Sequence, residues 1–202
     1  MNMLVDLLPE NVTVGGVEYP INTDFRTSIL FEMMITDDEL EAAEKVSLAL
    51  QLYYPDVPED IGEAVDKILW FYKCGKMQNT HKTDNGDTED NTHVDRIYSF
   101  DYDDDYIFAA FMEQYGIDLQ DVEYLHWWKF KALFMGLNEN TEFCKIMGYR
   151  SVKISGNMSK EQRAFYNKMK EIHALPVSEK EQQMNDMLLE ALQNGGDLTG
   201  LV

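Results

Sequence analysis

Hydrophobic and polar residues alternate on both sides of a Gly-Gly pair near the start of the chain, in Val12-Thr-Val-Gly-Gly-Val-Glu-Tyr-Pro-Ile21. Alternation with a period of two is typical of β-strands, and adjacent glycines permit the positive φ angles of a tight turn. We therefore predict a β-hairpin over residues 12–21. Because a two-stranded hairpin is only marginally stable alone, we expect it to pack on the rest of the molecule.

After the hairpin, hydrophobic positions recur every three or four residues, which predicts helices. Thr23 is the expected N-cap of a first helix. Thr36-Asp-Asp-Glu39 has the spacing of a capping box and is expected to open a second helix that ends near Tyr53. Further helices are predicted from Pro58 to about Gly75, from Tyr106 to Gly116, from Val122 to Gly136, between Thr141 and Gly148, after Ser159 and after Ser178.

These elements predict a mainly α fold, a helical body with a short N-terminal β-hairpin packed on it, in a single domain over residues 1–202. Residues 76–96 have only two apolar positions and no period, so we expect an exposed acidic loop. Residues 177–202 are predicted to form an amphipathic C-terminal helix and tail. Its apolar stripe includes Met184, Met187 and Leu188.

The charge balance excludes broad classes of partner. The chain has 202 residues with 37 acidic and 17 basic side chains, for a net charge of −20. A surface this acidic repels phosphate backbones and anionic lipids, so we expect neither nucleic acid nor membrane as a partner. No run approaches the ~18 consecutive apolar residues of a membrane span, and the N-terminus lacks the pattern of a signal peptide.

The charges are also unevenly distributed. Residues 1–121 hold 27 acidic and 7 basic side chains, whereas residues 122–170 hold 4 acidic and 9 basic ones. The basic segment either pairs with the acidic part of the same chain or forms an interface for an acidic partner or another copy, which would make a homo-oligomer.

The residue patterns do not point to catalysis. No sequence motif for a nucleophile or a phosphate-binding loop is present, and Cys74 and Cys144 lack a CxxC spacing. The acidic run Asp101-Tyr-Asp-Asp-Asp105 lacks the glycine and glutamate positions of a calcium loop and is better suited to a helix start. We therefore expect a protein that is not an enzyme and binds no metal and no cofactor.

The densest hydrophobic segment is Leu125-His-Trp-Trp-Lys-Phe-Lys-Ala-Leu-Phe-Met-Gly-Leu137. Wound as a helix it is apolar on nearly every side, which places it in a core or between core and partner. His126 is expected to be a hydrogen-bonded core histidine. The predicted core residues are Leu125, Trp128, Leu133, Phe165 and Ile68. A second stripe is predicted to contact a partner, together with the C-terminal stripe: Trp127, Phe130, Lys131, Phe134, Met184, Met187 and Leu188.

Several strings in the sequence resemble one known family. They are Tyr19-Pro-Ile-Asn-Thr-Asp-Phe-Arg26, Phe100-Asp-Tyr-Asp103, Gln114-Tyr-Gly-Ile-Asp-Leu119, Leu125-His-Trp-Trp-Lys-Phe130 and Gly148-Tyr-Arg-Ser151. Together they resemble the bacteriophage gene-product-fifteen family of siphophages and prophages in Gram-positive hosts. The resemblance covers the chain from Leu7 to about Leu175.

The resemblance implies a role in phage tail assembly, because the family's genes usually lie between those of the major tail protein and the tape-measure protein. It implies a non-enzymatic chaperone that coats the tape-measure protein and helps recruit tail-tube subunits. Such a protein acts in the host cell cytoplasm and is absent from the mature virion. The alternative, suggested by the charge of −20, is an acidic DNA mimic or other phage inhibitor that binds a host defence nuclease.

Overall fold

The N-terminal hairpin forms as the sequence predicts. In the computed structural model, which describes residues 2–76 and 96–176, β1 (Asn11–Val14) pairs antiparallel with β2 (Val17–Pro20). Gly15 and Gly16 form the turn with φ angles of 57° and 79°, a region that only glycine adopts without strain. The Gly15 N–H donates to Glu63 Oε2 at 2.7 Å, which ties the turn to a helix.

Helices make up most of the remaining described chain, so the prediction of a mainly α fold with an N-terminal hairpin is confirmed. In chain order they are α1 (Phe25–Ile35), α2 (Ala42–Tyr53), α3 (Ile61–Tyr72), α4 (Asp104–Tyr115), α5 (Trp127–Met135), α6 (Glu142–Ser151) and α7 (Lys160–Ile172). The predicted loop at 76–96, apart from its two end residues, and the predicted C-terminal helix with Met184, Met187 and Leu188 lie outside the described residues.

Two helix starts near the N-terminus differ from the predictions. Asp24 caps α1 in place of Thr23, because its carboxylate accepts the Arg26 N–H. The capping box of α2 is formed by Glu41 and Glu44, so the helix begins at Ala42 and not at Thr36. Thr36 instead closes α1, its hydroxyl donating to backbone carbonyls of the last turn.

The largest difference is at α5, which begins at Trp127 and not at Val122. The residues before it are held extended against the start of α1. The Phe25 N–H donates to the Leu125 carbonyl at 2.9 Å, and the Trp127 N–H donates to the Thr23 carbonyl at 2.8 Å. If the helix began at Val122, these two hydrogen bonds would be lost, and backbone groups at the start of α1 would lack a partner.

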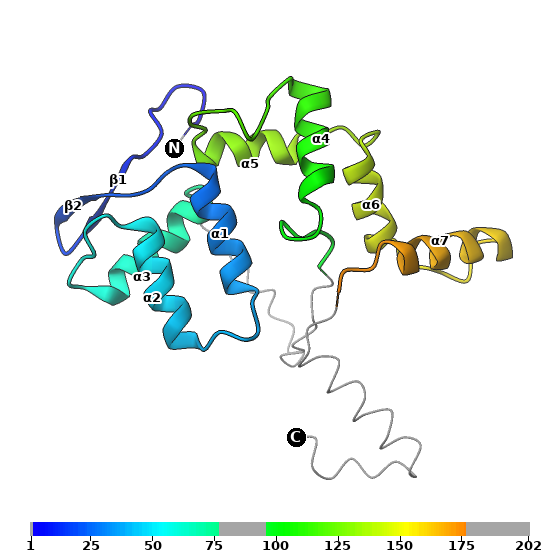
Figure 1. The fold of residues 1–202 in the computed structure, drawn as a ribbon, viewed down its shortest axis with the longest axis horizontal. Coiled ribbons are helices and arrows are strands. Elements are labelled where there is room, and N and C mark those ends of the chain that lie inside the picture. Colours follow the sequence, from blue (N-terminus) through cyan, green and yellow to red (C-terminus); the bar gives the residue numbers. More distant parts are fainter. Residues whose placement is uncertain (1, 77–95, 177–202) are drawn as a thin grey trace, which may run out of the picture.

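Figure 1 shows α5 along the top of the molecule, with α1, α2 and α3 on the side of the hairpin and α4 and α6 on the other side. α7 contacts α6 and projects away from the body. α5 buries Trp127, Trp128, Phe130 and Phe134 against its neighbours, whereas Lys129 and Met135 stay exposed. Two aromatic stripes of the helix are thus covered, which fits its almost wholly apolar sequence. Among the described residues, no helix combines the length and apolar character needed to cross a bilayer.

Candidate partner-binding surface

The aromatic stripe predicted to contact a partner is buried, so that prediction is wrong. Trp127 and Phe130 have no exposed surface, and Phe134 is also buried. Trp127 Nε1 donates to the Tyr72 carbonyl at 2.9 Å, and Trp128 Nε1 donates to the Phe71 carbonyl at 2.7 Å. Both indoles thus donate to carbonyls in the last turn of α3, and the Phe71 carbonyl also accepts the Cys74 N–H at 2.9 Å.

Phe130 lies at the centre of the aromatic core. Its ring stacks on Phe25 of α1 at 4.9 Å between centroids and on Phe111 of α4 at 5.0 Å. Lys131 is half-buried, with its Nζ over the rings of Tyr72 and Trp127 at 5.8 and 5.1 Å. Its ammonium is therefore engaged within the molecule and does not stand out toward a partner.

The predicted core residues divide into three groups. Trp128 and Ile68 are buried in the core, and Leu125 and Leu133 are half-buried against it. Phe165 is 48% exposed, so its assignment to the core is wrong. The reason is that α7 packs mainly on α6 and projects from the body, so that much of the Phe165 side of the helix stays open.

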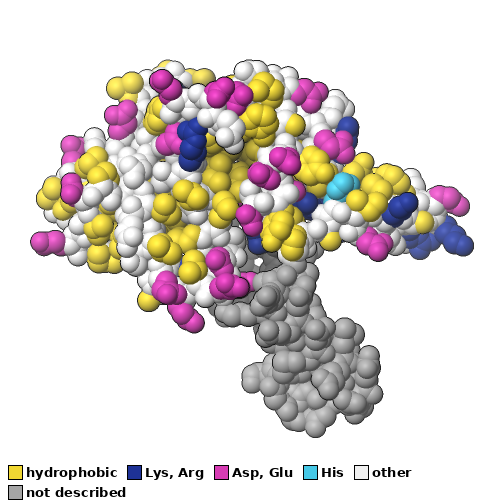
Figure 2. Space-filling model, viewed as in Figure 1, with side chains coloured by type: hydrophobic (Ala, Val, Ile, Leu, Met, Phe, Trp, Pro, Cys, Tyr) yellow, Lys and Arg dark blue, Asp and Glu magenta, His cyan; other side chains and the backbone are white. Residues whose placement is uncertain are grey.

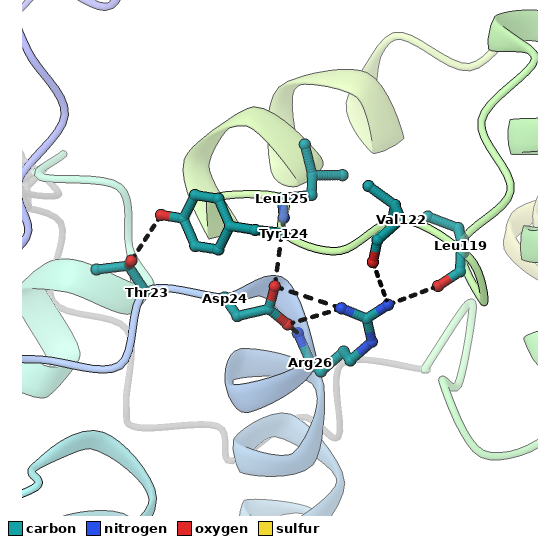
Figure 3. A network of polar contacts seen from close by, with 7 residues as sticks. All are labelled: Thr23, Asp24, Arg26, Leu119, Val122, Tyr124 and Leu125. Atoms are coloured by element: carbon teal, nitrogen blue, oxygen red, sulfur yellow. Dashed lines mark hydrogen bonds and ion pairs between the residues drawn. The ribbon is translucent and has the colours of Figure 1, made fainter.

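Three of the strings that carry the family resemblance meet in space, at a site we name the signature junction: residues 23–26 with residues 119–130. Figure 3 shows the Arg26 guanidinium donating to the carbonyls of Leu119 and Val122 at 3.0 and 2.8 Å. Asp24 accepts from Arg26 and from the Leu125 N–H at 3.3 Å. Each polar group binds another part of the same chain, so the junction holds α1 to α5.

His126 completes the junction and is the hydrogen-bonded core histidine that the sequence predicts. Its Nδ1 accepts the Trp128 N–H at 3.0 Å, which makes it the N-cap of α5. Its Nε2 therefore carries the proton and donates to the Pro9 carbonyl at 3.1 Å. Burial lowers the pKa of His126, because the cationic form loses hydration.

An open groove lies elsewhere, on α1, α2 and the segment before α4, and we name it the acidic groove. It has a volume of about 870 Å³. Its apolar lining is Leu30, Met33, Met34, Leu40, Leu48, Leu52 and Phe100, and its charged lining is Glu32, Asp37, Asp38, Glu39, Asp101 and Arg96. In Figure 2 hydrophobic side chains gather over the centre of the molecule, and acidic side chains stand around them.

Within the groove, Leu30 is 51% exposed although it sits in the middle of a helix. Glu32 accepts a hydrogen bond from the Tyr72 hydroxyl. Burial, and then the neighbouring Glu32 carboxylate, raise the pKa of Tyr72, so the hydroxyl stays protonated and can donate. The groove therefore has a wide apolar floor and a carboxylate fixed in its wall.

One wall of the groove is anchored by a buried ion pair. Asp103, at the N-cap of α4, accepts from Arg150 of α6 at 2.6 and 2.8 Å and from the Ser99 N–H at 2.9 Å. Arg150 also donates to the carbonyls of Ile97 and His173. A bidentate pair in a nearly dry site fixes geometry strongly, so residues 97–103, α6 and the end of α7 are held together.

α7 presents a second exposed apolar surface. Phe165, Met169 and Ile172 lie at i, i+4 and i+7, on one face of the helix. Phe165 and Ile172 are 48% and 57% exposed, and Met169 is half-buried. α7 is amphipathic and packs on α6, but it buries no residue completely, so part of its apolar face is uncovered within the described part of the chain.

The described residues hold no candidate metal site, and both of their cysteines are free. Over residues 2–76 and 96–176, no group of three or more His, Cys, Asp or Glu side chains could hold a metal ion. Cys74 and Cys144 are both free thiols. Burial raises the pKa of Cys74, which makes its thiol a weak nucleophile.

The sequence did not single out the groove or the ion pair. The groove had a local signal: Ile29, Leu30, Met33 and Met34 make an apolar stripe on α1 wider than one contact face needs. The ion pair had none, because Asp103 and Arg150 are 47 residues apart and only the tertiary fold brings them together.

Comparison with known proteins gives a match to a protein family. No curated protein and no solved structure matches the chain. The family described as Bacteriophage Gp15 protein matches residues 4–175, a range that contains the signature junction, nearly all of the acidic groove and α7. This match spans most of the sequence, and the chain therefore belongs to the bacteriophage Gp15 protein family.

Proposed function

We propose that this protein is a non-enzymatic phage tail-assembly chaperone that coats the tape-measure protein and helps recruit subunits of the major tail protein. Membership of a phage protein family supports a role in the phage cycle. The observation that carries the proposal is the acidic groove, an open apolar surface rimmed by carboxylates. Exposed apolar surface of this kind marks a protein-binding site.

The groove suits an amphipathic helix. One helical turn with its side chains occupies about 500 Å³, so a groove of about 870 Å³ holds the inserted half of roughly three turns. A tape-measure protein is expected to be a long helix whose apolar stripe aggregates when uncovered. Methionines line part of the groove floor, and their flexible side chains adapt to successive segments of such a client.

The charge of the chain fits the same role. The carboxylates of the rim favour a client segment with basic flanks, and they disfavour acidic segments. A net charge of −20 would keep a coated client in solution. We place this activity in the host cell cytoplasm, before the tail is complete, and we propose that the protein leaves before the virion matures.

Co-expression with the tape-measure and major tail proteins of the same phage tests the proposal. We expect the wild-type chain to co-purify with the tape-measure protein and to keep it soluble. Leu30→Asp, which places a charge in the groove floor, should reduce the captured amount at least tenfold. Met135→Asp is the matched control, because Met135 is 74% exposed at the end of α5 and does not line the groove.

Two results would contradict the proposal. One is a wild-type chain that neither captures nor solubilises the tape-measure protein. The other is equal capture by the wild-type chain and by the folded Leu30→Asp variant. A parallel assay for inhibition of host nucleases covers the alternative function: strong inhibition without tape-measure binding would favour a DNA mimic.

A further inference from the structure

We propose that α7 of one copy docks in the acidic groove of a second copy, so that the chain alone associates head to tail. The partner is then another copy of this protein, which goes beyond the proposed function. The inference rests on two surfaces of the described chain that complement each other in shape and charge: an exposed amphipathic helix and an open apolar groove.

α7 is available for this contact. Its apolar face, formed by Phe165, Met169 and Ile172, is largely uncovered. Ring contacts to Tyr149 and Tyr166 leave Phe165 48% exposed. A helix that inserts such a face into an apolar groove buries area that favours association.

α7 cannot reach the groove of its own molecule while the junction of α6 and α7 is intact. Lys170 Nζ donates to the Arg150 carbonyl at 2.9 Å, and Arg150 Nε donates to the His173 carbonyl at 2.5 Å. These bonds fix the end of α7 on α6, and Figure 1 shows the helix pointing away from α1 and α2. An occupant of the groove that comes from α7 must therefore belong to a second copy.

The charges of the two surfaces are opposite. Five acidic residues and one basic residue line the groove, as named above. α7 carries four basic residues, Lys160, Arg163, Lys168 and Lys170, against the acidic Glu161 and Glu171. Lys168 lies about 60° from Phe165 around the helix axis, so it flanks the apolar face and can approach the rim. Burial of apolar surface and attraction between opposite charges therefore both favour the docking of α7 in the groove.

The C-terminal segment is the main competitor for the groove. It follows Pro176, which lines the groove, and the sequence gives it an apolar stripe. However, residues 177–202 carry five acidic residues and one basic residue. This charge has the same sign as the rim, and like charges at short range disfavour the contact. Charge complementarity thus favours α7 over the C-terminal segment as the occupant of the groove.

A contact between two different surfaces is heterologous. Each copy in a dimer keeps one unused groove or one unused α7, so association continues into chains or closes into a ring. A groove filled by α7 cannot hold a client helix at the same time. Only this last consequence rests on the proposed function, because the self-association involves the chain alone.

Complementary variants test the proposal by sedimentation velocity of the full-length chain at about 100 μM. We expect the wild type to form species larger than a dimer. Phe165→Asp removes the docking face but keeps the groove, and Leu30→Asp removes the groove but keeps α7. Each variant alone should be monomeric, with association at least tenfold weaker, and an equimolar mixture should stop at the dimer.

Controls separate this contact from others. Met135→Asp should behave as the wild type, and circular dichroism should show that all variants are folded. Association of the wild type should weaken from about 50 to 500 mM salt, over which the Debye length shrinks about threefold. Three results would overturn the proposal: a monomeric wild type, oligomers of Phe165→Asp equal to those of the wild type, or a mixture of variants that stays monomeric. Loss of oligomers in Leu188→Asp would also overturn it, by assigning the contact to the C-terminal segment.

Discussion

The signature junction and the acidic groove both combine apolar side chains with carboxylates, yet they use them in opposite ways. At the junction, Asp24 and Arg26 bind backbone groups of the same chain, and Trp127 and Phe130 have no exposed surface. In the groove, apolar side chains such as Leu30 remain half-exposed and carboxylates stand at the rim. The first region is complete within one molecule, whereas the second has surface left for a partner.

This difference explains why the distinctive residues lie outside the surface that we propose for binding. The Leu125-His-Trp-Trp-Lys-Phe130 string is distinctive because several of its side chains make specific hydrogen bonds. Trp127 and Trp128 cap α3, and His126 caps α5. An apolar groove does not require one particular side chain at each position, because different aliphatic residues of similar size can form the same floor. In this chain, the strings that carry the resemblance thus serve the fold, and the surface that we propose for partners is found only in three dimensions.

Replacing Trp127 is expected to have the largest effect on stability. Trp127→Ala leaves a core cavity and removes the donor for the Tyr72 carbonyl, so it should cost about 3–5 kcal/mol of unfolding free energy. Phe165→Ala on α7 should cost less than about 1 kcal/mol. Denaturant melts of the two variants give both values. If both variants lost the same unfolding free energy, the contrast between the buried junction and the exposed α7 would be wrong.

Breaking the buried ion pair should have the next largest effect. Arg150→Met leaves the Asp103 carboxylate buried without its cation, which should cost about 3 kcal/mol. The double variant Asp103→Leu/Arg150→Met should recover part of the loss, because no unpaired charge remains. Urea melts measure both variants. A single variant as stable as the wild type would show that the pair does not anchor the groove wall.

Arg26→Lys sharpens the comparison at the junction. An ammonium lacks the planar fork of the guanidinium and cannot hold Asp24 and the Leu119 and Val122 carbonyls in one geometry. Arg26 is partly exposed, so we expect a loss of about 1 kcal/mol, measured by thermal melts. Groove binding by the folded variant should be unchanged. A variant that melts normally but no longer binds a partner would make the junction part of the binding surface.

The smallest effect concerns His126 and pH. Its folded pKa is lowered, so below the ordinary value near 6.5 the unfolded chain binds a proton more readily than the folded one. This contribution to stability is complete above pH 6.5 and is lost as the pH falls through the lowered folded pKa. Melts of the wild type and of His126→Asn at pH 7.5 and 5.5 isolate it. The variant should lose less stability than the wild type over this interval, and an equal loss would contradict the assignment.

The sequence predicts the elements of this fold well where local patterns decide them. The Gly15-Gly16 turn, the end of α4 at Gly116 and the Ser159–Gln162 capping box all form as expected. The predicted start of α5 was wrong because residues 122–126 have helical periodicity but pair with the start of α1. Tertiary hydrogen bonds outweighed a local preference there.

The burial of individual aromatic residues could not be predicted in the same way. Two adjacent tryptophans point about 100° apart, which suggested one core face and one partner face. This interpretation assumed that α5 lies at the edge of the core. Because α5 packs against α1, α4 and the end of α3, both aromatic stripes are covered, and the end of α3 offers a carbonyl to each indole. The exposure of Phe165 likewise depends on α7 having α6 as its main neighbour in the described chain.

Amide hydrogen exchange tests the central claim, that the acidic groove and not the signature junction receives the client. The Phe165→Asp variant, which should be monomeric with a free groove, is measured alone and in the complex purified after co-expression with the tape-measure protein. We predict at least tenfold slower exchange in the loops that border the groove, at residues 36–41 and 99–102, with residues 122–126 unchanged. A complex that protects residues 122–126 or the hairpin, and leaves the groove loops as fast as in the free chain, would contradict the account.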